Sequence, residues 1–476
     1  MKTAIVWFRQ DLRLADNPAL RAALAAAERV VPVYIHAPVS GATWPMGAAS
    51  RWWLHYSLEA LDAALRGLGS RLVLRRGASF QVLAGLIAET GASGVYWNRC
   101  YEPSAIARDT EIKRVLRGEG LAIETYNASL LYEPWEIQRE GGAPYRVFTP
   151  FWKAMQKHGL DFRPEPAPAS MPPVAEALWS LSAGELGLLP KIPWDLGFHE
   201  CWRVGEAGAS LRLAEFLASE LAEYRELRDR PDLPGTSRLS PHLHFGEIGP
   251  RQIVHAARSA PLPLAEIGAE AYLREIAWRE FAHHLLYHFP DTTDEPMDPR
   301  FARFPWAEDY REALAAWRRG LTGYPLVDAG MRELWHTGWM HNRVRMVVAS
   351  LLAKNLLIPW REGARWFWDT LVDADLANNT LGWQWTAGCG ADAAPYFRVF
   401  NPVAQGQRFD PDGAYVRRWV PELAGLPATF IHKPWEAPPA VLRAAGVKPG
   451  ETYPAPIVDA RASRERALEA FGRIKR

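Results

Sequence analysis

The sequence contains little cysteine. Only Cys100, Cys201 and Cys389 occur in 476 residues, and no two of them form a Cys-x-x-Cys pair. Three separated cysteines cannot form an even disulfide framework, and they argue against a zinc site or an iron–sulfur cluster. Such usage is typical of a reducing compartment, so we expect a cytoplasmic protein and no metal site.

Long apolar runs and an excess of charge are also missing. No stretch approaches the ~18 apolar residues of a membrane-spanning helix, and the apolar start is too short for a signal peptide. The formal net charge is +1, which neither favours nor excludes nucleic acid because a neutral protein can carry a local basic groove. The Gly-x-Gly-x-x-Gly fingerprint is absent after the first predicted strand, which argues against a nicotinamide enzyme.

The first 130 residues alternate short apolar runs with helical patterns. The first helix should start at Asn17-Pro18, an N-cap followed by proline at N1. Alternation of this kind predicts a Rossmann-like α/β domain with a parallel five-stranded sheet that is covered on both faces. The predicted strands are Thr3–Trp7, Val30–Ile35, Arg71–Leu74, Gly94–Trp97 and Leu121–Thr125.

The rest of the chain divides into a linker and a helical region. Residues 131–200 are rich in proline and glycine and are predicted to wrap the surface as a semi-rigid linker. Residues 201–476 follow a helical period and predict a large all-α domain. Its predicted helices are Leu211–Tyr224, Ile248–Arg258, Ala271–His288, Tyr310–Arg319, Val327–Gly338, Asn342–Leu356 and Arg361–Leu371, with a short one over Arg464–Arg476.

Two segments, 335–346 and 373–385, concentrate tryptophan, arginine, aspartate and asparagine. Arg345 could pair with Asp373 and Asp375 and hold the edge of a flavin-like ring, or it could form a structural salt bridge between helices. The consecutive amides Asn378 and Asn379 suit neither a helix interior nor an apolar core. These segments predict a polar pocket walled by indoles.

Residues 235–241 place hydroxyl groups and Arg238 before a helix that Ser240 would cap. This pattern favours an anion site, and the alternative is a well-capped helix start. Trp278 and Trp385 could stack on a flat aromatic ligand. Three arginines could contact phosphates around such a cavity, although each taken singly also suits a core or surface role: Arg279, Arg343 and Arg398.

Taken together and in this order, the motifs resemble those of the photolyase/cryptochrome family, and within it the class I cyclobutane pyrimidine dimer (CPD) photolyases. The resemblance covers essentially the whole chain. The matching stretches are residues 7–18, 235–240, 278–281, 323–332, 339–343, 373–385 and 392–402.

The resemblance implies an enzyme of light-driven DNA repair, a deoxyribodipyrimidine photo-lyase. One non-covalent FAD per chain would lie in the helical domain, and reduced FAD would donate an electron to a dimer flipped out of UV-damaged DNA, single- or double-stranded. The FAD ligands carried over by motif are Tyr224, Thr236, Ser237, Arg238, Leu239, Ser240, Arg345, Asp373, Asp375 and Asn379.

The same resemblance implies three further sets of residues. The lesion contacts are Glu275, Trp278, Asn342, Met346 and Trp385, beside Asn379 at flavin N5. The electron-transfer chain is Trp383, Trp360 and Trp306. The DNA contacts are Arg228, Arg343 and Gln405, to which the arginine pattern adds Arg279 and Arg398. We expect a monomer without a membrane partner.

Three residues distinguish the subfamilies. The (6-4) photolyases carry two histidines where this chain has Asn342 and Met346, and plant-type cryptochromes carry Asp where it has Asn379. These residues favour CPD repair over the two alternatives, (6-4) repair and blue-light signalling. Many class I enzymes have Gly-Gly where this chain has Thr380-Leu381.

A second, light-harvesting chromophore is common in the family. The folate pattern has Asn-Glu where this chain has Ser104-Ala105. This difference argues against folate, and a deazaflavin, a flavin or no second chromophore stay open, with deazaflavin expected ahead of folate. The pocket is predicted between about 36–53 and 98–109.

Overall fold

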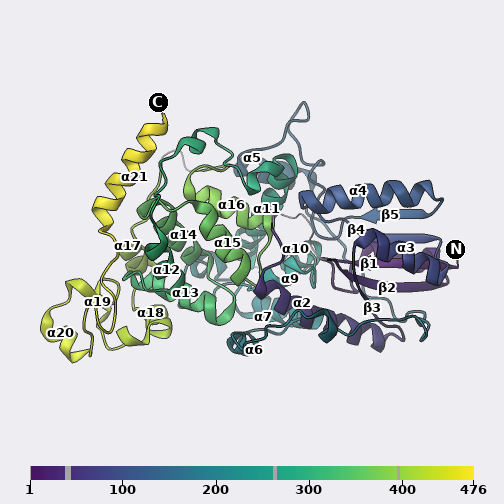
Figure 1. The fold of residues 1–476 in the computed structure, drawn as a ribbon, viewed down its shortest axis with the longest axis horizontal. Coiled ribbons are helices and arrows are strands. Elements are labelled where there is room, and N and C mark those ends of the chain that lie inside the picture. Colours follow the sequence, from purple (N-terminus) through teal and green to yellow (C-terminus); the bar gives the residue numbers. More distant parts are fainter. Residues whose placement is uncertain (1, 38–43, 261–264, 394–396, 476) are drawn as a thin grey trace. The chain divides into compact units, whose positions relative to one another are not determined.

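A computed structural model of the chain describes residues 2–37, 44–260, 265–393 and 397–475 (Figure 1). The chain divides into two compact units. Unit 1 comprises Met1–Trp194, Trp202–Ala222 and Ser237–Pro290. Unit 2 comprises Asp195–Cys201, Glu223–Thr236 and Asp291–Arg476. The predicted limits at 130/131 and 200/201 divide the chain differently, and those domain boundaries stay a prediction.

Unit 1 is built around a parallel five-stranded sheet with the strand order β3-β2-β1-β4-β5. All five predicted strands are confirmed, with ends shifted by one or two residues. In β1 every residue is buried, as expected for a central strand that helices cover on both faces. The strands are β1 Thr3–Phe8, β2 Arg29–His36, β3 Val73–Arg76, β4 Gly94–Asn98 and β5 Ala122–Tyr126.

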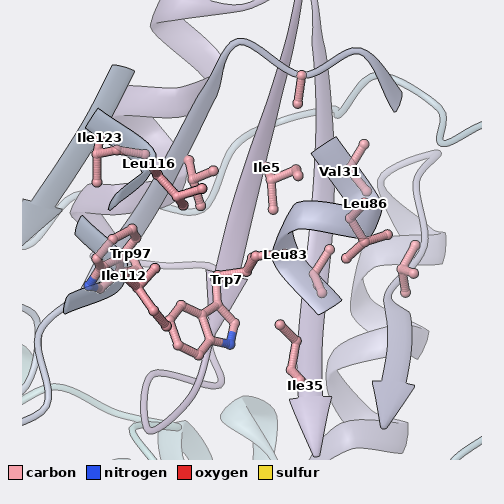
Figure 2. Close-up of a cluster of buried hydrophobic side chains, with 14 of the residues drawn as sticks. Ile5, Trp7, Val31, Ile35, Leu83, Leu86, Trp97, Ile112, Leu116 and Ile123 are labelled. Carbon is pink, nitrogen blue, oxygen red and sulfur yellow. The ribbon is translucent and has the colours of Figure 1, made fainter. Parts of the chain in front are cut away.

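One face of the sheet packs on two helices through an apolar cluster (Figure 2). Trp7 and Trp97 meet edge to face with ring centroids 5.8 Å apart, and Leu83 and Leu116 cover them from the helices α3 and α4. On the other face α1 packs against β1 and β4. Asn17 caps α1 by accepting from Leu20 N, as predicted. The unit 1 helices are α1 Pro18–Ala26, α2 Ala48–Gly67, α3 Ser79–Thr90, α4 Pro103–Gly118, α5 Phe148–His158, η1 Gly184–Leu186, α7 Glu206–Ser219, α9 Ser240–His244, α10 Pro250–Arg258 and α11 Ala265–His288.

Unit 2 is helical in the described residues, and its longer helices agree with the predicted periodicity. The short η2 Pro290–Thr293 leads into it from unit 1. Its elements are α6 Leu196–Cys201, α8 Tyr224–Leu227, η3 Pro299–Arg303, α12 Arg311–Arg319, α13 Pro325–Thr337, α14 Asn342–Ser350, η4 Leu351–Asn355, α15 Trp360–Thr370, α16 Leu376–Ala387, α17 Pro402–Phe409, α18 Ala414–Trp419, η5 Pro421–Leu423, α19 Ala428–Ile431, η6 Pro434–Glu436, α20 Pro439–Ala444 and α21 Ala460–Lys475.

Three predictions of secondary structure were wrong in detail. The helix predicted over 211–224 starts earlier, as α7, and ends at Ser219. The helix predicted over 342–356 changes at Leu351 into one π-helical turn, η4, a form that often accompanies functional sites. The predicted linker contains α5, whose Phe148 and Trp152 are buried, because its apolar residues recur at helical spacing and find a core to cover.

Among the described residues, no helix is both long enough and apolar enough to cross a lipid bilayer.

Candidate functional site

Unit 2 contains a partly buried ion pair that the sequence predicted. Arg345 on α14 donates from Nη2 to Asp373 Oδ2 at 2.8 Å and from Nε to the Met340 carbonyl at 2.7 Å. Asp373 is 8% exposed, and its Oδ1 is buried without a hydrogen-bond partner in the described part of the chain. Leaving a buried carboxylate oxygen unpaired is costly. This atom therefore indicates a donor that the protein itself does not supply.

Asp375, two residues further on, has a different task. It caps α16 by accepting from Asn378 N at 2.8 Å. The expectation that consecutive amides do not suit a helix interior was wrong, since Asn378 and Asn379 lie in the first turns of α16. The Asn378 amide reaches back to the capping carboxylate, and Asn379 Nδ2 donates to the Ala364 carbonyl on α15 at 3.1 Å. A local partner thus accepts from the Asn378 amide, and a carbonyl of the neighbouring helix accepts from the Asn379 amide.

Helix α14 presents several predicted site residues together. Asn342, Arg345 and Met346 recur at spacings of three and four, so they share one helix face. Asn342 is exposed and Met346 is partly exposed. The flavin clamp and two lesion contacts predicted from the resemblance therefore lie on a single face of one helix.

Arg343 points to a partner that the sequence did not reveal. Its Nη2 donates to Asp229 Oδ2 at 2.8 Å, and its guanidinium carbon lies 4.4 Å from the centroid of the Phe409 ring. Asp229 lies 114 positions away in the chain, so no local pattern could have indicated the pair. A phosphate contact through Arg343 would compete with this carboxylate.

His341 is another residue that sequence reasoning missed. It is 3% exposed, and its Nδ1 accepts from Arg343 N at 3.2 Å, which caps α14. Burial lowers the pKa of His341 to about 4. Asp229 raises this pKa, whereas Arg343 and Arg345 lower it further. The imidazole is therefore neutral at pH 7 with its proton on Nε2, and the capping acceptor is preserved.

The three tryptophans of the predicted electron-transfer chain differ in exposure. Trp383 on α16 and Trp360 at the start of α15 are buried, whereas Trp306 is partly exposed. Ala307 N donates to the Leu357 carbonyl at 2.8 Å. The residues next to Trp306 therefore lie beside the residues that precede Trp360. The order of burial is that expected of a path from an interior cofactor to the surface.

The remaining unit 2 residues of the predicted sites occupy short elements and helix ends. Tyr224 begins α8, and Arg228 follows that helix with its guanidinium 5.7 Å from the Tyr224 ring centroid. Trp385 Nε1 donates to the Asp392 carbonyl at 3.1 Å. Thr236 ends the 223–236 segment, Arg398 is exposed, and Gln405 on α17 has a buried Oε1 that finds no partner in the described residues.

Three predicted site residues lie in unit 1 on the helix α11, namely Glu275, Trp278 and Arg279. Trp278 stacks on Phe148 with ring centroids 3.7 Å apart and planes at 7°. Phe148 thus covers one indole face, and the Trp278 side chain stays partly exposed. Arg279 is mostly buried, with an 11% exposed side chain that donates to the Ser129 carbonyl at 2.7 Å. Its predicted DNA contact stays a prediction.

The predicted anion loop, residues 235–241, is divided between the units, with Gly235 and Thr236 in unit 2 and the rest in unit 1. Arg238 has a φ of 51°, a left-handed conformation that is uncommon outside glycine, and its guanidinium lies 4.6 Å from the Trp202 ring centroid. The expected Ser240 cap was wrong, because Leu239 is the N-cap and Ser240 is the first residue of α9. Backbone strain of this kind is often found at functional sites.

The described residues fit the FAD that the resemblance implies. A buried carboxylate oxygen without a partner beside a clamped arginine suits a ring system with an N–H donor and a carbonyl acceptor. Gly235 allows a close approach of the backbone, since a Cβ there would lie 2.6 Å from Leu227 Cβ. A flat heteroaromatic cofactor matches this donor set.

The fold is that of a two-part protein, an N-terminal α/β domain followed by a helical C-terminal domain that carries the ion pair. Comparison with family models agrees. Residues 4–173 match the DNA photolyase family, and residues 272–473 match the FAD binding domain of DNA photolyase. The chain belongs to the photolyase/cryptochrome family.

Individual proteins show the same likeness over the full length. The chain is 49% identical to a deoxyribodipyrimidine photo-lyase of Agrobacterium fabrum, covering 100% of this chain and 99% of that protein. It is 42% identical to cryptochrome-2 of Arabidopsis thaliana, covering 100% of this chain and 79% of that protein. The crystal structure of a bacterial class III photolyase from Agrobacterium tumefaciens superposes with a TM-score of 0.96 at 48% identity, covering 100% of this chain and 98% of that one. The predicted family and fold class are thereby confirmed.

Proposed function

We propose that this protein is a light-driven DNA-repair enzyme that splits cyclobutane pyrimidine dimers. The observation that carries the proposal is the shared face of α14, which joins Arg345 of the flavin clamp to Asn342 and Met346. Bound FAD in its reduced form supplies the light-excited electron that opens the dimer. The likeness to a class III photolyase favours that class over the predicted class I.

The chain's own residues bind and orient the reactants. Arg345 and Asp373 would hold the flavin edge, and the Ala364 carbonyl on α15 fixes the orientation of the Asn379 amide. Trp278, stacked on Phe148, would stack on a flipped base, an interaction worth about 1–3 kcal/mol. Flipping a damaged pair costs less than flipping a sound one, so this stacking selects the lesion.

Repair assays under blue light test the proposal. We expect repair of CPDs by the FAD-loaded, reduced protein and little repair of (6-4) products, because Asn342 and Met346 provide no imidazole acid. Efficient (6-4) repair would contradict the selectivity. Absence of CPD repair in a protein that binds FAD would overturn the proposal.

The second candidate is blue-light signalling, which the likeness to cryptochrome-2 favours. Asn379 argues against it, because an amide cannot supply the carboxyl proton that the plant-type aspartate could. Asn379→Asp is the matched variant. If the wild-type protein repairs CPDs and Asn379→Asp weakens that repair, the result favours the enzyme. If neither protein repairs CPDs, the result favours signalling.

We further propose that Trp383, Trp360 and Trp306 carry electrons to oxidised FAD. Their graded burial supports this order. Trp306→Phe should slow photoreduction and spare repair by protein reduced beforehand. Normal photoreduction in Trp383→Phe would rule out this chain.

DNA binding is proposed for Arg228, Arg343, Arg398 and Gln405, with the lesion pocket at Trp278. Trp278→Ala should abolish the preference for damaged DNA and retain weak general binding with its salt dependence. Arg343→Ala should weaken binding to damaged and undamaged DNA alike. Full damage discrimination in Trp278→Ala would place the pocket elsewhere.

A second chromophore remains a proposal of its own, a deazaflavin rather than folate. Part of the predicted pocket, residues 38–43, lies outside the described residues. An absorption spectrum of the purified protein, with a band beyond those of FAD, tests it.

A further inference from the structure

The helices α15 and α16 of unit 2 pack against each other at a glycine (Figure 1). A Cβ built on Gly363 would lie 2.0 Å from Trp383 Cη2 and 2.4 Å from its Cζ3. Leu352 Cδ2, from the π-helical turn η4, would lie 2.6 Å from the same Cβ. Real Cβ atoms do not approach heavy atoms so closely, so only glycine admits the Trp383 ring at this position.

Glycine at 363 has no conformational explanation. It lies in the first turns of α15, and its φ is not among the positive values. Glycine is the poorest helix former after proline. The space that it leaves for the indole is therefore the physical reason for its presence.

The next residue of α15 holds a second group. The Ala364 carbonyl accepts from Asn379 Nδ2 at 3.1 Å. A carbonyl oxygen can only accept, so the NH2 side of the Asn379 amide must face α15, and Oδ1 is directed to its other side. The same turn of α15 thus determines which face of the Asn379 amide is presented as an acceptor.

We infer that Gly363 is a positioning residue, and that the Gly363–Ala364 turn sets both the Trp383 ring and the Asn379 amide. This inference rests on the proposed function, because it assigns the turn a role in electron transfer to FAD. The two groups are four positions apart on α16, so a shift of that helix away from α15 displaces both. Gly363 then affects both the position of Trp383 on the electron path and the environment of the flavin.

A double-mutant cycle tests the packing. Gly363→Ala should lower the Tm of the FAD-loaded protein by several degrees, since overpacking a dense core is destabilising. In a Trp383→Phe background most of that loss should disappear, because the phenyl ring lacks the outer indole atoms that residue 363 meets. An equal loss of Tm in both backgrounds would overturn the inference.

Photoreduction and the flavin spectrum test the positioning. Gly363→Ala should slow photoreduction of bound FAD several-fold and shift its visible absorption band. Gly382→Ala is the matched control, because it adds the same methyl group on α16 beside Trp383. Apart from the chain neighbours and the helix's own backbone, no atom of the described residues lies within 4 Å of this new Cβ. A rate and spectrum of Gly363→Ala equal to those of Gly382→Ala would overturn the inference, even with a lowered Tm.

The proposed function fails separately. It fails if the wild-type protein takes up no FAD or if the FAD-loaded, reduced protein does not repair CPDs. The positioning role fails if the wild-type and Gly382→Ala proteins are photoreduced normally and Gly363→Ala is equally fast.

Discussion

Two buried charges, one in each unit, differ in how the chain satisfies them. Arg13 in unit 1 is 0% exposed, and its guanidinium donates to four backbone carbonyls, those of Ala15, Asp16, Ala128 and Gly246. Asp373 in unit 2 is 8% exposed, and one of its carboxylate oxygens has no partner in the described residues. A fully satisfied buried charge stabilises one fold, whereas a partly satisfied one indicates a ligand.

The strongest way to break this comparison is to remove the satisfied charge. Arg13→Leu should destabilise the protein by about 3–5 kcal/mol, because several buried carbonyls lose their donor at once. Chemical denaturation measures the loss. Arg461→Gln, at an exposed surface pair, is the control and should change stability by less than about 0.5 kcal/mol. A small effect of Arg13→Leu would show that water replaces the guanidinium.

Removing the partly satisfied charge should have a small effect on stability and a large effect on FAD affinity. Asp373→Asn keeps the shape and leaves Arg345 a neutral acceptor, so we expect a loss of only about 1–2 kcal/mol in the apoprotein. FAD affinity should fall about 10- to 100-fold, because a charged acceptor is lost at the cofactor. Titration with FAD and denaturation of the apoprotein measure the two effects. Unchanged FAD affinity would contradict the assignment of Asp373.

His341 extends the comparison to the pH dependence of stability. Its folded pKa of about 4 lies below the unfolded value of ~6.5, so its contribution to stability is present above pH 6.5 and is lost as pH falls toward 4. Between pH 7 and 5 the wild-type protein should lose about 1–2 kcal/mol more than His341→Asn, which keeps a capping acceptor without titrating. Parallel pH profiles would contradict the shifted pKa.

The smallest expected effect concerns Asp229. Its carboxylate holds Arg343, so Asp229→Asn should free this arginine and raise DNA affinity several-fold. The slope of the logarithm of affinity against the logarithm of salt concentration should become steeper by about the amount expected for one additional phosphate contact. Binding assays at several salt concentrations measure both, with undamaged DNA as the comparison. Unchanged affinity would show that Arg343 does not contact phosphate.

Local patterns in the sequence predicted the elements well. The five strands follow from continuous apolar runs, and α1 follows from Asn17-Pro18, because both depend on neighbours within a few residues. The motifs also named Arg345 with Asp373 correctly, although the two residues are 28 positions apart in separate segments, because an arginine and a nearby carboxylate are complementary in charge. The prediction missed α5, although its apolar residues recur at helical spacing, and it missed the change to a π-helical turn at Leu351.

The sequence by itself determined the strands, the main helices, the family and the types of residue at the site. Only the tertiary structure decided their partners. Phe148 under Trp278 and Asp229 beside Arg343 are separated from those residues by more than a hundred positions, and Gly363 lies 20 positions from Trp383 on another helix. The periodicity of a helix or strand indicates on which face of that element a residue lies. It does not indicate which distant element packs against that face. That choice depends on the packing of whole elements.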